Sequence, residues 1–146
     1  MPLPRLVDLG ELVEGTPLPE HSLAPDIMDV ASFIGAAGFA IPIFLDPVAA
    51  RETGLERPLI PAEYKSAFLL AYLRQLAKPN GRIVRLQSGF RRPDYHGNRF
   101  TISGQVTRID EVEGGREVNV ELWIEQATGD RSVRSSAVLL LPNAES

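Results

Sequence analysis

One helix constrains this chain more than any other feature, because it is apolar around most of its circumference. The segment PAEYKSAFLLAYLRQLA starts at Pro61 and ends before Pro79-Asn80-Gly81, with proline at a helix start and a turn signal after it. Phe68, Leu69 and Tyr72 widen an apolar face that consists of Ala67, Leu70, Ala71, Leu73 and Leu76. A helix of this kind needs cover on most sides, and a curved sheet wrapped around it would supply that cover.

Four strand-rich segments follow this helix, and turn residues separate each from the next. They are residues 82–92, 99–112, 116–128 and 131–142. In the third segment Val118, Val120, Leu122 and Ile124 alternate with polar residues, as in a half-buried strand, and Trp123 lies on the other face. Consecutive strands joined by short turns predict an antiparallel meander, and helices followed by strands predict an α+β fold.

The first half of the chain carries proline-marked helix starts. We expect a short lead-in strand near residues 6–9 and a broken edge strand within the proline-rich residues 16–25. A helix is predicted to begin at Pro25-Asp26, followed by an irregular apolar loop around Pro42. Asp46-Pro47 then predicts a second helix start, with aspartate as N-cap and proline at the first helical position.

Composition narrows the class of protein. A length of 146 residues predicts one domain across residues 1–146. The net charge of −4 argues against a nucleic-acid partner, because phosphate binding needs a concentrated basic surface. The chain has no cysteine and only two distant histidines, His21 and His96, so we expect no metal and no cofactor. No signal peptide or membrane-spanning run is evident, so we expect a soluble, cytoplasmic protein.

A set of short motifs spreads over residues 7–142. They are Phe33, Gly38, Pro42, Leu45-Asp46-Pro47, Ala49-Ala50, Gly54, Pro58-Leu59-Ile60, Phe90-Arg91-Arg92-Pro93, His96-Gly97-Asn98 and Ser103-Gly104-Gln105-Val106. Together with the order of elements, they resemble the MaoC-like (R)-specific enoyl-CoA hydratase family. The resemblance implies a hot-dog fold, in which an antiparallel curved sheet wraps around one long central helix, and it implies pairing of two hot-dog subunits.

The catalytic signature of that family reads Asp, any residue, Asn, Pro, any residue, His. Its histidine and aspartate activate a water that adds across the double bond of an enoyl thioester. Aligned on Pro42 and Asp46, the three polar positions fall on Phe39, Ile41 and Phe44. No residue that activates water is therefore left at the place the resemblance implies, and we do not expect this chain to hydrate enoyl thioesters by itself.

The resemblance also implies that the start of the long helix holds the thioester carbonyl through backbone N–H groups. The family's His-Gly pair falls on Pro61-Ala62, where Pro61 has no N–H but Ala62 and Glu63 do. Glu63 and Tyr64 are the nearest polar side chains and our candidate catalytic residues. The alternatives are an acid that complements the helix dipole and an aromatic of the core or an interface. We expect Lys65 to reach solvent.

The candidate substrate-binding residues come from both halves of the chain: Phe39, Ile41, Phe44, Pro61, Ala62, Glu63, Arg92 and His96. His96 lies in a turn that is either plain surface or the border of a ligand entrance. Arg92 belongs to a basic group with Arg82, Arg85 and Arg91, which suits either solvent or the phosphates of coenzyme A.

Three functions remain open. The first is an acyl-thioester-binding subunit without the hydratase dyad, paired with an active enoyl-CoA hydratase subunit on a bulky acyl-CoA such as a steroid side chain. The second is a repurposed enzyme (a dehydratase, cyclase, isomerase or decarboxylase) that uses Glu63 or Tyr64. The third is a non-enzymatic acyl or polyketide binding module. The partner is accordingly a second copy or another hot-dog subunit.

Overall fold

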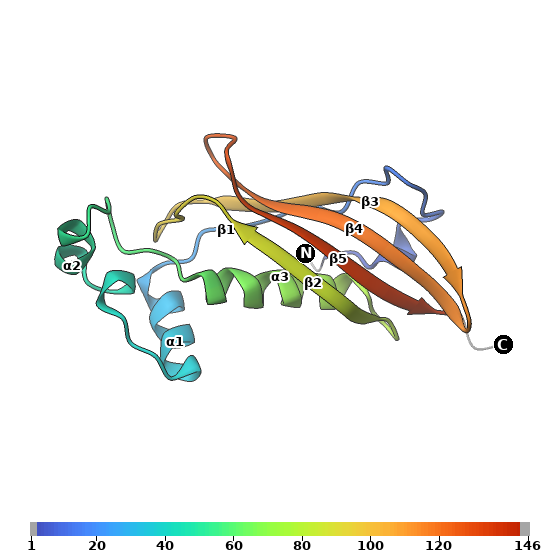
Figure 1. The fold of residues 1–146 in the computed structure, drawn as a ribbon, viewed down its shortest axis with the longest axis horizontal. Coiled ribbons are helices and arrows are strands. Elements are labelled where there is room, and N and C mark those ends of the chain that lie inside the picture. The colour runs from blue at the N-terminus through green and yellow to red at the C-terminus, as the bar shows by residue number, and fades with distance from the viewer. Residues whose placement is uncertain (1–2, 144–146) are drawn as a thin grey trace.

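The computed structural model describes residues 3–143 as a curved sheet with one long helix in its concavity and two short helices beyond one end (Figure 1). In chain order the elements are η1 (Leu6–Asp8), β1 (His21–Leu23), α1 (Ile27–Ala37), η2 (Pro42–Phe44), α2 (Pro47–Glu52), α3 (Ala62–Leu76), β2 (Arg82–Phe90), β3 (Phe100–Val112), β4 (Gly115–Gln126) and β5 (Arg131–Pro142). The predicted α+β class and the four C-terminal strands are confirmed.

The sheet is antiparallel throughout and has the order β1-β3-β4-β5-β2. The predicted meander holds only for β3, β4 and β5. The prediction was wrong for β2, which pairs with β5 at the far edge, because residues 91–99 carry the chain across the sheet end instead of turning it back. The hairpin turns before Gly115 and Arg131 are tight, with left-handed φ angles of 78° at Gly114 and 88° at Gly129.

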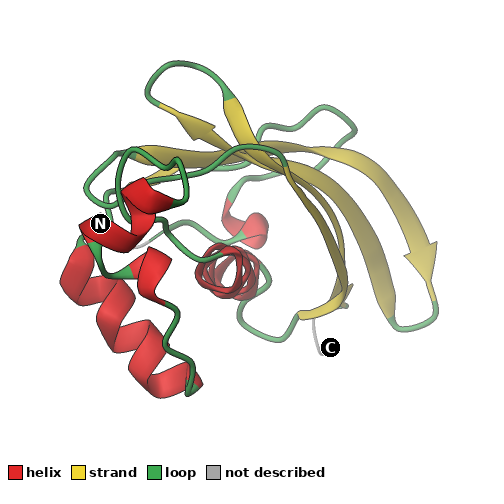
Figure 2. Cartoon of the chain, turned by 60° about the vertical axis from the view of Figure 1, so that its left-hand side comes forward, coloured by secondary structure: helices red, strands yellow, loops and turns green. Residues whose placement is uncertain are grey.

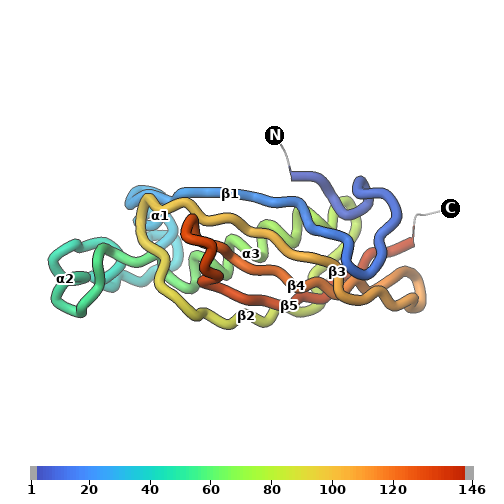
Figure 3. Tube along the Cα trace, turned by 90° about the horizontal axis from the view of Figure 1, so that it is seen from above, coloured from blue at the N-terminus to red at the C-terminus, as the bar shows by residue number. Residues whose placement is uncertain are grey.

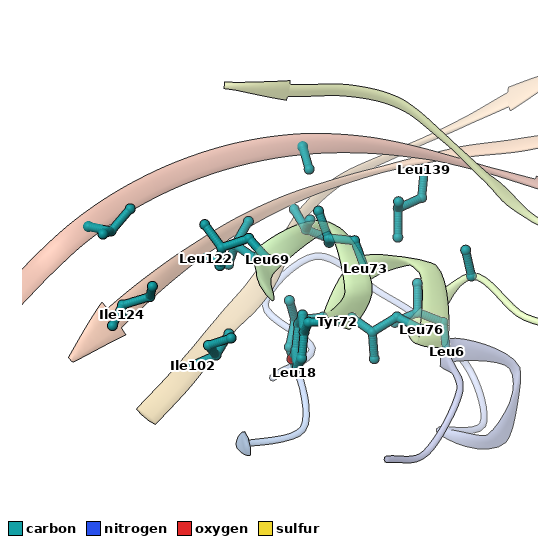
Figure 4. Close-up of a cluster of buried hydrophobic side chains, with 14 of the residues drawn as sticks. Leu6, Leu18, Leu69, Tyr72, Leu73, Leu76, Ile102, Leu122, Ile124 and Leu139 are labelled. Atoms are coloured by element: carbon teal, nitrogen blue, oxygen red, sulfur yellow. The ribbon is translucent and has the colours of Figure 1, made fainter. Parts of the chain in front are cut away.

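Helix α3 lies in the concavity of the sheet, as the view along its axis shows (Figure 2). Its buried face consists of Leu69, Tyr72, Leu73 and Leu76, which meet Ile102, Leu122, Ile124 and Leu139 from the strands (Figure 4). Burial of each such leucine stabilises the fold by roughly 1.5–3 kcal/mol. We expected α3 to be covered on most sides. Leu70 is 39% exposed, however, so the face of α3 that points away from the sheet is uncovered.

The lead-in segment differs from the prediction of a short strand. Residues 6–8 form a 3-10 turn, closed by an Arg5–Asp8 ion pair at 2.7 Å between Nη2 and Oδ1. Leu6 in this turn is completely buried against the core. The proline-rich residues that follow form the broken edge strand that was predicted: His21–Leu23 pair with β3, and Pro17 forms an isolated bridge to Gln105 of the same strand.

Both predicted helix starts are confirmed. The Asp26 carboxylate accepts hydrogen bonds from the backbone N–H groups of Met28 and Asp29, and Asp46 accepts one from Val48 at 2.8 Å. The apolar loop between the helices contains one short 3-10 turn, η2, which begins at Pro42. Helices α1 and α2 project past the end of the sheet near the start of α3 (Figure 3). Among residues 3–143, no helix is long and apolar enough to cross a membrane.

Candidate functional site

Four aromatic rings gather where the catalytic signature would lie. We call Phe33, Phe39, Phe44 and Tyr64 the aromatic cluster. The ring centroids of Phe39 and Phe44 are 6.0 Å apart, and Phe33 lies 6.3 Å from Phe39 and 5.3 Å from Tyr64, all edge to face. The signature positions 39 and 44 therefore contact each other, and Phe33 on α1 connects Phe39 to Tyr64 in the first turn of α3.

The backbone around the aromatic cluster keeps a fixed form. The Asp46 N–H donates to the carbonyl of Pro42 at 2.7 Å, and the Leu59 N–H donates to the carbonyl of Ile43 at 3.1 Å. These bonds tie the signature segment to α2 and to the connector that precedes α3. Ile41, at the asparagine position of the signature, points away and is 46% exposed. The segment thus has a fixed backbone but no acid or base.

The start of α3 presents mixed chemistry. Pro61 is buried and caps the helix without a side-chain hydrogen bond, so the N–H groups of the first turn have no capping side chain. Ala62 is half-buried, and Glu63 is exposed. Tyr64 is half-buried, and burial, aided by the negative charges of Asp29 and Asp26, raises the pKa of its phenol. Tyr64 therefore stays a proton donor to higher pH than a free tyrosine.

Lys65 is buried, so the expectation that it reaches solvent was wrong. Its Nζ lies 2.9 Å from Oδ2 of Asp94, and both side chains are at most 4% exposed. Oδ1 of Asp94 accepts a second bond from Nε2 of Gln126 at 2.8 Å. The Phe90 ring lies 5.5 Å from the same ammonium. Gln126 is half-buried. We call Lys65, Asp94 and Gln126 the buried polar triad after its buried ion pair, and it joins α3 to the loop after β2 and to the end of β4.

The loop of residues 91–99 carries the other candidate residues. The His96 Nε2 donates to the carbonyl of Leu59 at 3.1 Å, and the His96 backbone N–H donates to the carbonyl of Pro58. Burial lowers the pKa of His96, although the carbonyl groups of Leu59 and Phe44 and the Asp26 carboxylate act in the opposite direction. His96 is thus a half-buried tie between this loop and the connector before α3.

Arg92 borders a separate cavity of about 420 Å³ at the same end of the sheet. The cavity wall also includes Tyr95, Asn98, Arg99 and Thr128. Arg92 lies 3.5 Å from the Asp130 carboxylate in an exposed ion pair. The candidate substrate-binding residues thus fall into two groups, the aromatic cluster with the start of α3, and the loop that holds Arg92 and His96. The backbone of residues 58–60 connects the two.

Sequence reasoning missed the buried polar triad, yet a signal for it existed. Lys65 precedes Leu69 by four residues, Tyr72 by seven and Leu76 by eleven, so it lies on the buried stripe of α3. A charged residue on such a stripe indicates a buried partner. Nothing in the spacing singles out Asp94 and Gln126 as those partners, since they come from distant segments. Among residues 3–143, no group of three or more His, Asp or Glu side chains is placed to hold a metal ion.

The sheet order and the central helix in its concavity define the hot-dog fold. The (R)-hydratase from A. caviae involved in PHA biosynthesis has 24% sequence identity and a TM-score of 0.81, over 91% of this chain and 99% of its own. The ChsH1-ChsH2 complex from Mycobacterium tuberculosis has 21% sequence identity and a TM-score of 0.80, over 90% of this chain and 99% of its own.

A MaoC-like dehydratase from Rhodospirillum rubrum gives 16% identity and a TM-score of 0.76, over 92% of this chain and 96% of its own. No protein-family model matches the sequence, and neither does any curated protein. At these identities the likeness establishes the fold, and the hot-dog prediction is confirmed. The activity has to be argued from the residues of the site.

Proposed function

We propose that this chain is an acyl-thioester-binding subunit of the MaoC-like family that lacks the hydratase dyad and pairs with an active enoyl-CoA hydratase subunit. One observation carries the proposal. Phe39 and Phe44 occupy the aspartate and histidine positions of the signature and contact each other at 6.0 Å, while the surrounding backbone bonds persist. The two positions that match the aspartate and histidine of the signature therefore carry no group that can deprotonate water, which supports the proposal.

An apolar site suits an apolar acyl chain. The aromatic cluster would form the wall against which a bulky acyl group, such as a steroid side chain, would lie. The free N–H groups of Ala62 and Glu63 would hold the thioester carbonyl, and Arg92 would meet the phosphates of coenzyme A. A structural neighbour that is itself a complex of two chains, ChsH1 and ChsH2, supports a heteromeric arrangement.

Binding and turnover have to be measured separately to test this proposal. We expect the purified chain to bind a non-reactive bulky acyl-CoA thioether in calorimetry and to leave the matching enoyl-CoA unhydrated in a spectrophotometric assay. Hydration is expected to appear when the chain is co-expressed with a hydratase-like protein encoded beside it. A self-contained homodimer with full hydratase activity of its own would refute the proposal.

A repurposed enzyme is the second candidate, and the surroundings of Tyr64 favour it. The phenol lies beside Phe33 at the start of α3, where its hydroxyl can donate a hydrogen bond or a proton to a bound ligand. In this alternative, Tyr64→Phe or Glu63→Gln abolishes turnover of the true substrate while binding persists. Unchanged turnover in both variants would exclude these two residues as the proton-transferring groups. Tight binding with no turnover in the wild-type chain would indicate the non-enzymatic binding module instead.

A further inference from the structure

The turn between α3 and β2 contains the dipeptide Asn80-Gly81. Asparagine loses its side-chain amide fastest when glycine follows it, because glycine has no side chain to hinder attack by its backbone nitrogen on the asparagine amide. Asn80 is exposed, so water reaches its side chain. Asn98 and Asn119 precede an arginine and a valine, whose side chains slow the same reaction. We call residues 77–82 the α3–β2 junction.

The fold requires glycine at position 81, because the end of α3 and the end of β5 meet there. A Cβ atom at this position would clash with the carbonyl oxygen of Ala77 and would lie 2.8 Å from Cδ2 of Leu141. Only glycine lets the two backbones approach so closely. The close packing of the α3–β2 junction therefore keeps the reactive partner of Asn80 in place.

The same packing restrains the nitrogen that would attack. The Gly81 N–H donates to the carbonyl of Ala77 at 2.8 Å, and the next residue, Arg82, is paired with Leu140 of β5. Attack on Asn80 requires the Gly81 nitrogen to turn away from Ala77 and approach Cγ of Asn80, which breaks this hydrogen bond. The reaction is therefore open only to molecules in which the α3–β2 junction has come apart locally.

Positive side chains surround the turn. Arg74, Lys78 and Arg82 line a cavity of about 540 Å³ at the α3–β2 junction, and Lys78 and Asn80 line a second one of about 360 Å³. Within residues 3–143, none of the three cations has a carboxylate within 4.0 Å. Residues 64–93 contain no Asp or Glu at all. A carboxylate at position 80 would meet only cations nearby in the sequence, so the surroundings favour a charged product.

We propose that Asn80 is a deamidation site that the fold keeps closed and that reacts when the α3–β2 junction opens. The Gly81 nitrogen loses its proton and bonds to Cγ of Asn80, the bond from Cγ to Nδ2 breaks, and ammonia leaves with that proton. The resulting succinimide takes up one water, and hydrolysis at either carbonyl gives aspartate or isoaspartate. Isoaspartate adds one carbon to the main chain, so the hydrogen bond from Gly81 to Ala77 does not re-form in its original geometry. The site is independent of the proposed function.

Peptide mass mapping after incubation in warm, mildly alkaline buffer tests the proposal. In the urea-unfolded chain, we expect Asn80 to gain the mass difference between amide and acid before Asn98 and Asn119 do, with part of the product detected as isoaspartate by enzymatic methylation. In the native chain, the gain at Asn80 should be about tenfold or more slower, since only the open fraction reacts. Asn80→Gln should abolish the early gain, because glutamine forms the corresponding ring far more slowly.

Two matched variants separate local opening from global unfolding. Leu141→Ala removes the side chain that covers Gly81, whereas Leu139→Ala removes a buried leucine of the same strand that does not contact Gly81 in this way. With both variants shown to be folded by circular dichroism, Leu141→Ala should speed deamidation of Asn80 about tenfold relative to Leu139→Ala.

Three outcomes would overturn the proposal. If Asn80 stays an amide in the unfolded chain while other asparagines react, it is not a deamidation site. If native and unfolded chains react at the same rate, the fold does not protect it. If Leu139→Ala and Leu141→Ala react equally fast, the reaction follows global unfolding and the α3–β2 junction is not the gate.

Discussion

The two sides of the start of α3 differ in their chemistry, and neither side matches what the sequence leads one to expect. On the side of α1 and η2, where an aspartate and a histidine are expected, Phe39 and Phe44 form edge-to-face contacts. On the side of β2 and β4, along the buried stripe of the helix, Lys65 and Asp94 form a buried ion pair at 2.9 Å. The expected polar site is apolar, and an apolar stripe is interrupted by charge.

The apolar side and the charged side of the start of α3 play different parts in the fold. The contact between Phe39 and Phe44 is apolar and needs no buried polar partner. The buried polar triad is fully hydrogen-bonded on its carboxylate and joins three segments, so it acts as a positioning device for the loop that holds Arg92 and His96. A buried polar group near the start of α3 is therefore not by itself a sign of a catalytic residue.

Lys65→Met is expected to have the largest effect on the free energy of unfolding. It leaves the Asp94 carboxylate buried with only the Gln126 amide as partner, which costs about 3–5 kcal/mol. Urea unfolding followed by circular dichroism measures this loss. Arg74→Met, on an exposed position of the same helix, is the control, and the double variant Lys65→Met/Asp94→Leu should lose less than Lys65→Met. A loss below about 1 kcal/mol in Lys65→Met would show that the ion pair is not structural.

Restoring the polar signature at positions 39, 41 and 44 tests the apolar side of the start of α3. The triple variant Phe39→Asp, Ile41→Asn and Phe44→His should hydrate a short enoyl-CoA about 100-fold faster than the wild type, since a positioned acid–base pair contributes at least that much. A matched variant with Asn, Asn and Gln at the same positions has equal polarity but no base, and it should stay at the wild-type rate. Equal rates in both folded variants would show that the start of α3 does not hold a thioester carbonyl.

The aromatic cluster should contribute a smaller, measurable coupling to stability. A double-mutant cycle of Phe39→Leu and Phe44→Leu is expected to give a coupling energy of about 0.5–1.5 kcal/mol, the usual value for an edge-to-face pair. Val48→Ala, an exposed change on α2, provides the baseline. Strict additivity of the two leucine substitutions would mean that the rings merely lie near each other.

The smallest expected effect is a pH dependence of stability that His96 confers. Its pKa in the folded state lies below the ordinary value of 6.5, so the unfolded chain binds the proton more readily. The contribution is therefore complete above pH 6.5 and is lost as the pH falls through that value toward the folded-state pKa. His96→Gln should flatten the unfolding free energy between neutral and mildly acidic pH, whereas His21→Gln should not. Equal pH profiles for wild type and His96→Gln would contradict this.

Local signals in the sequence predicted much of the fold because their causes are local. Proline and aspartate fix a helix start within a single turn, so the starts at Asp26 and Asp46 were predictable. The alternation of apolar and polar residues in β4 predicted which of its side chains are buried. The pairing of β2 with β5 was not predictable in this way, because the length of the connection at residues 91–99 allows more than one neighbour.

For the candidate site, the sequence by itself determined what is missing. The identities at positions 39, 41 and 44 exclude an acid–base pair there whatever the tertiary structure is, because side-chain chemistry does not depend on the fold. Only the tertiary structure decided where Lys65 points and which carboxylate meets it. A charge on a buried stripe must find its partner through space, and Asp94 and Gln126 reach it from segments 29 and 61 residues further along the chain.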